Sequence, residues 1–286
     1  MSDTTRTSEP STRRSSVRRA GRARPILLVA AAVYLALMVA WAVLPGLFAH
    51  GDPIVGVATD GLQAPSAAHW FGTDATGRDM YTRVVFGSVH TLVTALIAVL
   101  FGLVFGTGIG LVAGSVRGVV DAVLMRLVDV LLAVPSLLLS LSIIIVLGFG
   151  TTQVAIAVGI TSVAAFARLA RAEVMRVRAM DYVEAAFASG GSFVSVLLRH
   201  VLPNSLTPVI ALAALQFGTA ILSIAALGFL GYGAPPPTPE WGLMIAEGRN
   251  YIATSWWLTT IPGVVVVLTV LAANRISTAI SERNRA

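Results

Sequence analysis

Six long apolar stretches constrain the fold of this chain more than any other feature. Each holds about 20 mostly apolar residues, the length of helix that crosses the hydrocarbon core of a bilayer, where every backbone amide must be bonded within its own segment. Only 12% of the 286 residues are charged, about half the share found in soluble domains. The sequence therefore predicts an all-α membrane protein with six transmembrane helices, over residues 26–48, 91–113, 123–147, 153–172, 208–229 and 258–280.

The distribution of positive charge predicts the orientation. All 20 basic residues are arginine, and seven of them precede the first apolar stretch: Arg6, Arg13, Arg14, Arg18, Arg19, Arg22 and Arg24. Such an excess beside a first span is typical of the cytoplasmic side, and we prefer this interpretation to a nucleic-acid-binding arm. Both termini are then expected in the cytoplasm, and residues 49–88, 148–152 and 230–257 outside the cell. The first stretch is too long for the apolar part of a signal peptide, so we expect it to be retained.

Missing residue types and motifs argue against several chemistries. Without cysteine the chain can form no disulfide, iron–sulfur cluster or thiol nucleophile. Without lysine it can form no P-loop, so any ATP that drives its work is hydrolysed by another chain. An intramembrane hydrolase is disfavoured because no G-x-S-x-G motif occurs. A gradient-driven secondary transporter is disfavoured because the apolar stretches lack carboxylates at mid-depth.

Two of the apolar stretches carry patterns of their own. In the third, Arg126 and Asp129 stand three residues apart, so they can form an intramembrane ion pair on one helix face, either functional or simply anchoring. In the second, a glycine recurs at every fourth residue from Gly102 to Gly114. Small residues at this spacing allow a neighbouring helix to approach closely, and ordinary helix packing is favoured over a sliding seam.

A polar segment, DYVEAAFASGGSFVSVLLRHVLPN, interrupts the apolar pattern at residues 181–204. Asp181 is expected to cap a short helix over residues 182–189, with Glu184 three residues later completing a capping box. Gly190 and Gly191 end that helix, and Ser192 is expected to cap a second one over residues 193–200. Pro203 is expected to force Leu202 into an extended conformation and close the segment. Such an elbow suits either a groove in a partner protein or the membrane surface, and periodicity alone leaves both open.

Three motifs indicate a known family. The spacing of EAA, Gly190 and LPN resembles the EAA loop of binding-protein-dependent ABC importer permeases. HWFGTDATGRD at residues 69–79 and PPPTPEWGLMIAEGRNYI at residues 235–252 resemble signatures of the second permease of the dipeptide, oligopeptide and nickel importers. The resemblance covers residues 66–280. It implies the type I importer permease fold, with a coupling helix that docks on a cytoplasmic ATPase subunit.

The resemblance also implies a function and a set of site residues. The chain is expected to line the pathway for peptides in the bacterial cytoplasmic membrane, or alternatively for nickel or another small solute. Its partners would be a second homologous permease, two ATPase subunits that bind ATP and Mg²⁺, and an extracytoplasmic binding protein, with no cofactor or metal in this chain and no nucleic acid. The coupling surface would comprise Asp181, Glu184, Ala185, Ala186, Gly190 and Pro203. The extracytoplasmic candidates, for gating and docking or merely for scaffolding, are Asp74, Arg78, Asp79, Glu240 and Trp241. Trp241, with Trp256 and Trp257, could alternatively belong to an interfacial aromatic belt.

Five regions follow from these expectations. Residues 1–25 form a disordered arginine-rich arm, because they contain almost nothing to bury. They are followed by a first transmembrane helix at 26–48, an extracytoplasmic loop at 49–88, a permease core at 89–280 that contains the coupling loop 181–204, and a cytoplasmic tail at 281–286.

Overall fold

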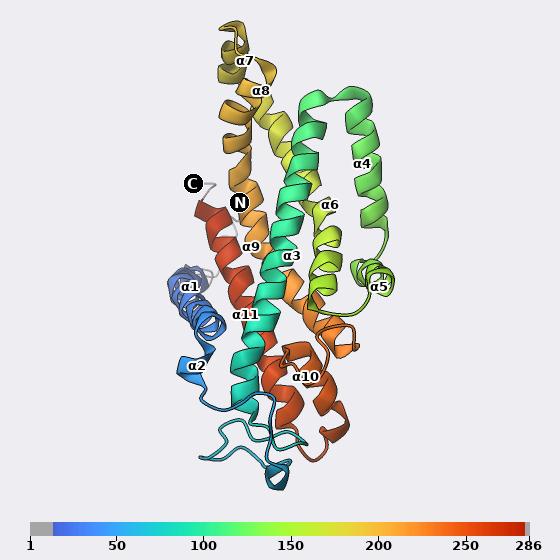
Figure 1. Cartoon of the computed structure of the whole chain (residues 1–286). Helices are drawn as coiled ribbons and strands as arrows, with labels where there is room; N and C mark the ends of the chain where they lie inside the picture. Colours follow the sequence, from blue (N-terminus) through green and yellow to red (C-terminus); the bar gives the residue numbers. More distant parts are fainter. Residues whose placement is uncertain (1–13, 284–286) are drawn as a thin grey trace, which may run out of the picture.

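The computed structural model describes residues 14–283, and this part of the chain is helical, without a named strand (Figure 1). Short helical turns named η lie between some of the helices: η2 (Ala58–Asp60), η3 (Leu197–Val201, a π-helical turn) and η4 (Arg249–Tyr251). The α-helices are α1 (Arg14–Val43), α2 (Pro45–Phe48), α3 (Met80–Val116), α4 (Gly118–Ala133), α5 (Ser136–Leu147), α6 (Thr151–Arg178), α7 (Asp181–Ala188), α8 (Phe193–Val196), α9 (Leu202–Phe229), α10 (Trp241–Gly248) and α11 (Trp257–Arg283).

Five segments among the described residues are long and apolar enough to cross a membrane, and the α4–α5 pair makes a sixth if it is counted as one broken span. The five are Ile26–Val43, Met80–Val116, Thr151–Arg178, Phe193–Phe229 and Trp257–Ile280. The predicted all-α bundle is therefore confirmed, but the continuous helix expected over residues 123–147 is wrong. Between α4 and α5 the chain bends by 97°. Pro135 lies at this bend, lacks an N–H and keeps the preceding Val134 extended, with φ −90° and ψ 131°.

The most extensive packing in the bundle is between α3 and α6. A Cβ added to Gly106 would lie 2.6 Å from the carbonyl oxygen of Val163, and one added to Gly110 would lie 2.5 Å from that of Ala167. Such distances leave no room for a side chain, so the glycine stripe brings the two backbones into direct contact. This is the ordinary packing role expected for the stripe.

The bundle has two distinct ends (Figure 1). The elbow end carries α7 and α8, whereas the plate end carries the long loop before α3 together with α10 and its flanking loops. We call residues 181–201 the elbow, and residues 49–79 and 230–256 the plate. Helix α3 has 37 residues, about 55 Å at 1.5 Å per residue, and runs from the plate to the elbow end. Helix α1 lies beside α11, where the Tyr34 hydroxyl donates to the carbonyl oxygen of Val265 at 3.1 Å.

Two boundaries differ from those expected. The arm predicted to be disordered through residue 25 is helical from Arg14, because arginine and alanine favour the helix and the apolar segment that follows supplies a helix to extend. Residues 1–13 lie outside the described part of the chain. Helix α3 begins at Met80, well before the predicted start at residue 91, because the side chain of Asp79 caps it by accepting from the backbone N–H of Thr82.

Candidate functional site

The elbow is a tight structure, and its two glycines explain why. Helix α7 ends in a Schellman motif, in which the N–H of Gly190 donates to Phe187 at 3.0 Å and that of Gly191 donates to Ala186 at 3.1 Å. Gly190 adopts a left-handed φ of 87°, which glycine tolerates without strain. A Cβ on Gly191 would lie 2.7 Å from the carbonyl oxygen of Ala186. The double glycine therefore fixes the elbow and does not loosen it.

A small apolar core holds the elbow against the bundle. Val183 and Val196 are buried in it, together with valines of α6 and Val201, and Ala186 packs against the same cluster. The prediction placed Ala186 on the docking surface, but the structure half-buries it against this core. The reason is helical periodicity, because Ala186 lies three residues from the buried Val183 on the same face of α7.

The opposite face of α7 is exposed. It carries Asp181, Tyr182, Glu184 and Ala185, and it continues through Gly190 at the turn. The elbow also exposes large apolar side chains that the sequence analysis missed, among them Phe193, 43% exposed, and Val194, 61% exposed. The signal for them was present in the sequence, since FVSV after the glycines places apolar residues in a segment otherwise treated as a connector.

The predicted caps of the elbow are partly right. Ser192 caps α8, as expected, by accepting from the backbone N–H of Ser195 at 3.4 Å. Asp181 is the first residue of α7 and not its cap; the cap position belongs to Met180, which is extended at φ −89° and ψ 141° and makes no side-chain capping bond. The short connection from α6 sets this register, because only Ala179 and Met180 separate the two helices. A carboxylate at the first helical turn still favours the helix dipole.

Leu202 and Pro203 do not close the segment, contrary to the prediction. Leu202 is helical at φ −57° and ψ −52°, and its N–H donates to the carbonyl oxygen of Leu197 in a π-helical turn. Pro203 then occupies the first turn of α9, where the missing N–H is tolerated. The Asn204 side chain donates to the carbonyl oxygen of His200 at 2.6 Å. The elbow therefore runs without a break into α9.

At the plate end, the loop motif GTDATGRD is organised around Asp74. Its carboxylate accepts from the backbone N–H and hydroxyl of Thr76 at 2.9 and 2.8 Å, and from the backbone N–H and Nε of Arg78 at 3.0 and 2.6 Å. Burial raises the pKa of Asp74, but these hydrogen bonds and the Arg78 charge outweigh it, so the pKa lies below its ordinary value. Asp74 and Arg78 therefore pair within the loop.

Arg83 connects that loop to the second plate motif. Its side chain is fully buried in the first turns of α3, with Nη2 2.9 Å from a carboxylate oxygen of Glu247 and Nε 3.6 Å from Asp74. Its Nη1 donates to the carbonyl oxygens of Pro53 and Pro237 at 3.1 and 3.4 Å. One arginine thus joins residues of both plate loops to α3 and α10. The sequence analysis missed Arg83 and Glu247, because their pairing spans 164 residues.

Glu240 and Trp241 fasten α10 between α3 and α9. Glu240 is buried and caps α10, accepting from the N–H groups of Gly242 and Leu243 at 2.8 and 2.9 Å. Burial raises the pKa of Glu240 to about 7 in spite of these donors. Trp241 is fully buried, and its Nε1 donates to the carbonyl oxygen of Val84 at 3.0 Å, so it is no part of an interfacial aromatic belt.

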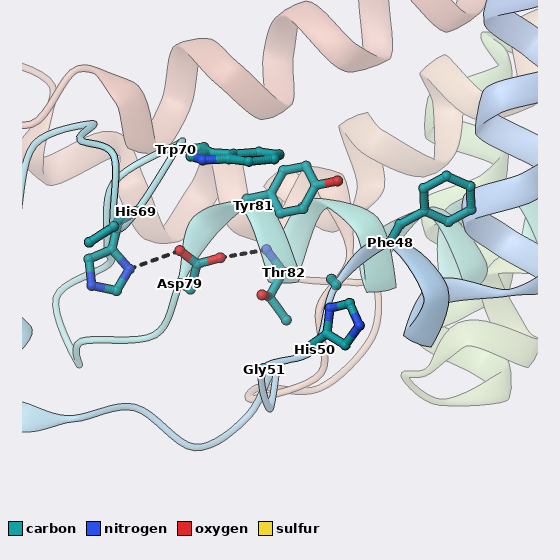
Figure 2. Close-up of a pocket in the computed structure, with 10 residues that line it drawn as sticks. Phe48, His50, Gly51, His69, Trp70, Asp79, Tyr81 and Thr82 are labelled. Atoms are coloured by element: carbon teal, nitrogen blue, oxygen red, sulfur yellow. Dashed lines mark hydrogen bonds and ion pairs between the residues drawn. The ribbon is translucent and has the colours of Figure 1, made fainter.

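Figure 2 shows a pocket of about 370 Å³ at the plate end, between the chain that follows α2 and the start of α3. Asp79 lies at its centre, with one carboxylate oxygen accepting from the N–H of Thr82 at 2.8 Å and the other 3.0 Å from Nδ1 of His69. Trp70, 65% exposed, lies against Tyr81 with ring centroids 5.1 Å apart. Asp79 therefore caps α3 and orients His69.

The predicted pair of Arg126 with Asp129 does not form. Asp129 instead lies 2.7 Å from Nη2 of Arg168, and Asp121 accepts from Nη2 of Arg171 at 2.6 Å. Both partners are on α6, because α4 packs along that helix and brings its carboxylates opposite the arginines. The Arg168–Asp129 pair is more than half exposed on both sides, so an anchoring role between helices fits it better than a buried relay.

Together, the helical bundle, its glycine-packed α3–α6 pair and the rigid elbow at one end of the bundle define a class of protein, the permease subunits of ABC importers. The chain belongs to the family of binding-protein-dependent transport system inner membrane components, and the model of this family matches residues 106–286. Members of this family are multi-pass inner-membrane transport subunits and not enzymes. The resemblance drawn from the three sequence motifs is thereby confirmed.

Relatives extend the similarity to most of the chain. It is 38% identical over 248 residues to the probable D,D-dipeptide transport system permease protein DdpC of Escherichia coli K12, covering 87% of this chain and 83% of that protein. It is 40% identical over 215 residues to the dipeptide transport system permease protein DppC of Alkalihalophilus pseudofirmus, covering 75% and 71%. It is 40% identical over 252 residues to the glutathione transport system permease protein GsiD of Shigella flexneri, covering 88% and 83%.

Solved structures share the fold. A chain of the MetNI methionine ABC transporter in an inward-facing conformation has a TM-score of 0.57 at 19% identity, covering 70% of this chain and 97% of that one. A chain of an amino acid ABC transporter crystallised with histidines has a TM-score of 0.55 at 17% identity, covering 71% and 94%. At these identities the comparison shows the type I importer permease fold and nothing about the substrate.

Proposed function

We propose that this chain and a second homologous permease line the pathway of an ATP-driven importer for peptides. The observation that carries the substrate class is the set of relatives, three of which are named for D,D-dipeptides, dipeptides and glutathione. All three substrates contain peptide or peptide-like backbones. In this proposal, an extracytoplasmic binding protein delivers the peptide, and two ATPase subunits bind ATP and Mg²⁺.

The elbow is the proposed docking surface for an ATPase subunit. Its exposed face combines the acidic Asp181 and Glu184 with the small Ala185 and the aromatic Tyr182, and its back is held by the valine core. A rigid element transmits a displacement of the ATPase subunit better than a flexible one does, and the continuous connection into α9 carries this displacement into the bundle. We assign Gly190 and Pro203 to the shape of this element and not to direct contact.

The proposed orientation follows the arginine distribution. The elbow end lies in the cytoplasm with both termini, and the plate end lies outside. The plate residues Asp74, Arg78, Asp79, Glu240 and Trp241 then form a fixed scaffold on which the binding protein docks, since their side chains are engaged with one another and with backbone groups. The five regions predicted from the sequence keep their functional order, with the arm shortened by the helix that begins at Arg14.

The elbow assignment is tested by isolating the tagged chain from its native membrane with and without Glu184→Arg. We expect ATPase subunits to copurify with the parent and to be lost from the variant. Asp52→Arg makes the same charge change on an exposed residue of the plate and serves as the matched control. ATPase subunits that are retained by Glu184→Arg, or lost equally from Asp52→Arg, would contradict docking at the elbow.

The substrate assignment needs a separate measurement. In cells that carry the complete transporter, uptake of a labelled dipeptide should depend on this chain and should be inhibited by unlabelled di- and tripeptides. Free amino acids and Ni²⁺ are the control competitors. Inhibition by Ni²⁺, without inhibition by peptides, would assign the chain to the nickel branch of the same subfamily.

A further inference from the structure

Arg178 lies where three parts of the elbow end meet. It is the last residue of α6, directly before the two-residue connection to α7. Its Nη1 donates to the carbonyl oxygen of Ser115 and lies 3.5 Å from that of Gly114, both in the last turn of α3. Its guanidinium carbon lies 5.8 Å from the ring centroid of Phe193, the first residue of α8. One side chain thus contacts α3 and the second half of the elbow from the end of α6.

The α3 carbonyls that Arg178 contacts need a partner. The last four carbonyl groups of a helix find no N–H donor within it, and they carry the negative end of the helix dipole. Arg117 has a left-handed φ of 61°, and its N–H donates to the carbonyl oxygen of Ala113, so α3 ends there and α4 starts in a new direction. A guanidinium from another helix satisfies these oxygens by charge-assisted hydrogen bonds, which are stronger than neutral ones.

The contact with Phe193 gives Arg178 a second function. A cation within about 6 Å of an aromatic centroid is attracted to the ring face. Phe193 is 43% exposed and otherwise lies at the edge of the elbow, outside its valine core. Phe193 therefore holds α8 against Arg178, and Arg178 in turn connects α8 to the end of α3.

From this geometry we propose that Arg178 is a positioning residue that clamps the elbow to the elbow end of α3. Because α3 continues to the plate, where Arg83 in its first turns joins both plate loops, the clamp links movement of the elbow to the plate through one helix. Besides Arg178, the elbow is joined to the bundle through its chain ends and through the valine core, against which Leu111 of α3 also packs. The proposed consequence for transport rests on docking of the ATPase at the elbow, but the clamp itself does not.

The clamp is tested on the chain alone in lipid nanodiscs. The chain contains no cysteine, so Val116→Cys at the end of α3 and Ala188→Cys at the end of α7 provide a unique pair of spin labels. Both positions are exposed. The parent should give one narrow distance distribution, and Arg178→Gln should broaden or shift it. Arg178→Lys, which keeps a cation near the carbonyls and the ring, should restore most of the parent distribution.

Phe193→Leu separates the two contacts, since it removes the ring and leaves the bonds to α3. It is expected to broaden the distribution less than Arg178→Gln does. An unchanged distribution in Arg178→Gln would overturn the clamp. Equal broadening in Arg178→Gln and Arg178→Lys with unchanged yield would overturn the role of the positive charge, because a cation near the carbonyls and the ring would then not hold the elbow.

The consequence for transport is measured in the complete complex. ATPase subunits should remain bound to the Arg178→Gln chain, while the stimulation of ATP hydrolysis by the loaded binding protein falls by about fivefold or more, the lower end of ordinary coupling between sites. Full stimulation despite a broadened elbow would overturn the link to transport. Loss of ATPase subunits from Glu184→Arg tests the docking surface independently, so failure of the clamp and failure of the docking proposal are distinguishable.

Discussion

Replacing Glu240 with glutamine should change how the stability of the protein depends on pH. Glu240 is almost completely buried, and burial raises its pKa from an ordinary 4.5 to about 7. A carboxyl whose pKa is raised by folding binds its proton more tightly in the folded state. The stability it contributes is therefore fully present below pH 4.5 and is lost as the pH rises to 7 and above.

The magnitude follows from the shift. A difference of about 2.5 pKa units at 1.36 kcal/mol per unit is about 3 kcal/mol of unfolding free energy between these limits. The variant carries no titratable group at this position, so it should lack this loss. Asp74, also at the plate end, has a lowered pKa and titrates in a more acidic range, so it does not obscure the difference between pH 5 and 8.

The assay is denaturant unfolding of parent and variant in lipid nanodiscs at four pH values from 5 to 8, followed by tryptophan fluorescence. The parent should lose stability relative to Glu240→Gln as the pH rises. Parallel pH profiles would refute the raised pKa. A parent that gains stability over the variant with rising pH would show that the N–H groups of Gly242 and Leu243 dominate and that the carboxylate is the favoured form.

Two further substitutions test the plate and the elbow. Arg83→Met leaves the carbonyl oxygens of Pro53 and Pro237 without this donor and leaves Glu247 with only the more distant Arg78, at 3.6 Å. It should therefore destabilise the fold by about 1–3 kcal/mol, measured by unfolding in nanodiscs. A yield and stability equal to those of the parent would contradict the network. Gly191→Val places a side chain 2.7 Å from the carbonyl oxygen of Ala186, so it should abolish peptide uptake while the chain still inserts into the membrane. The control Val194→Ala, at an exposed elbow position, should leave uptake unchanged. Normal uptake by Gly191→Val would refute the rigid elbow.

The parts of the fold that the sequence predicted well are those set by local patterns. Lipid requires long apolar helices, so the spans were visible from hydropathy alone. The glycine at every fourth residue identified a helix seam, and Gly190 identified the end of α7, because both depend on steric rules that act within a few residues. Ser192 was placed correctly as a cap for the same reason.

The errors and omissions concern interactions between distant residues or competition between local rules. Asp129 pairs with Arg168 across 39 residues, a choice that depends on how α4 lies along α6 and cannot be read from an i, i+3 spacing. Arg83 and Glu247 were missed for the same reason. At Pro203 two local rules conflict: the residue before a proline tends to be extended, but a proline is tolerated in the first turn of a helix. The second rule holds here, because a π-helical turn places Pro203 in the first turn of α9.

Cross-linking from two adjacent alanines of the elbow tests the central claim most directly. In a chain without native cysteine, Ala185→Cys and Ala186→Cys are adjacent but point about 100° apart around α7. Ala185 is exposed, whereas Ala186 is half-buried against the valine core. In native membranes, a short thiol-directed photo-cross-linker on Ala185→Cys should capture an ATPase subunit, and the same reagent on Ala186→Cys should capture much less. Equal capture from both positions, or none from Ala185→Cys in membranes where the parent chain copurifies with its ATPase, would contradict the elbow as the docking surface.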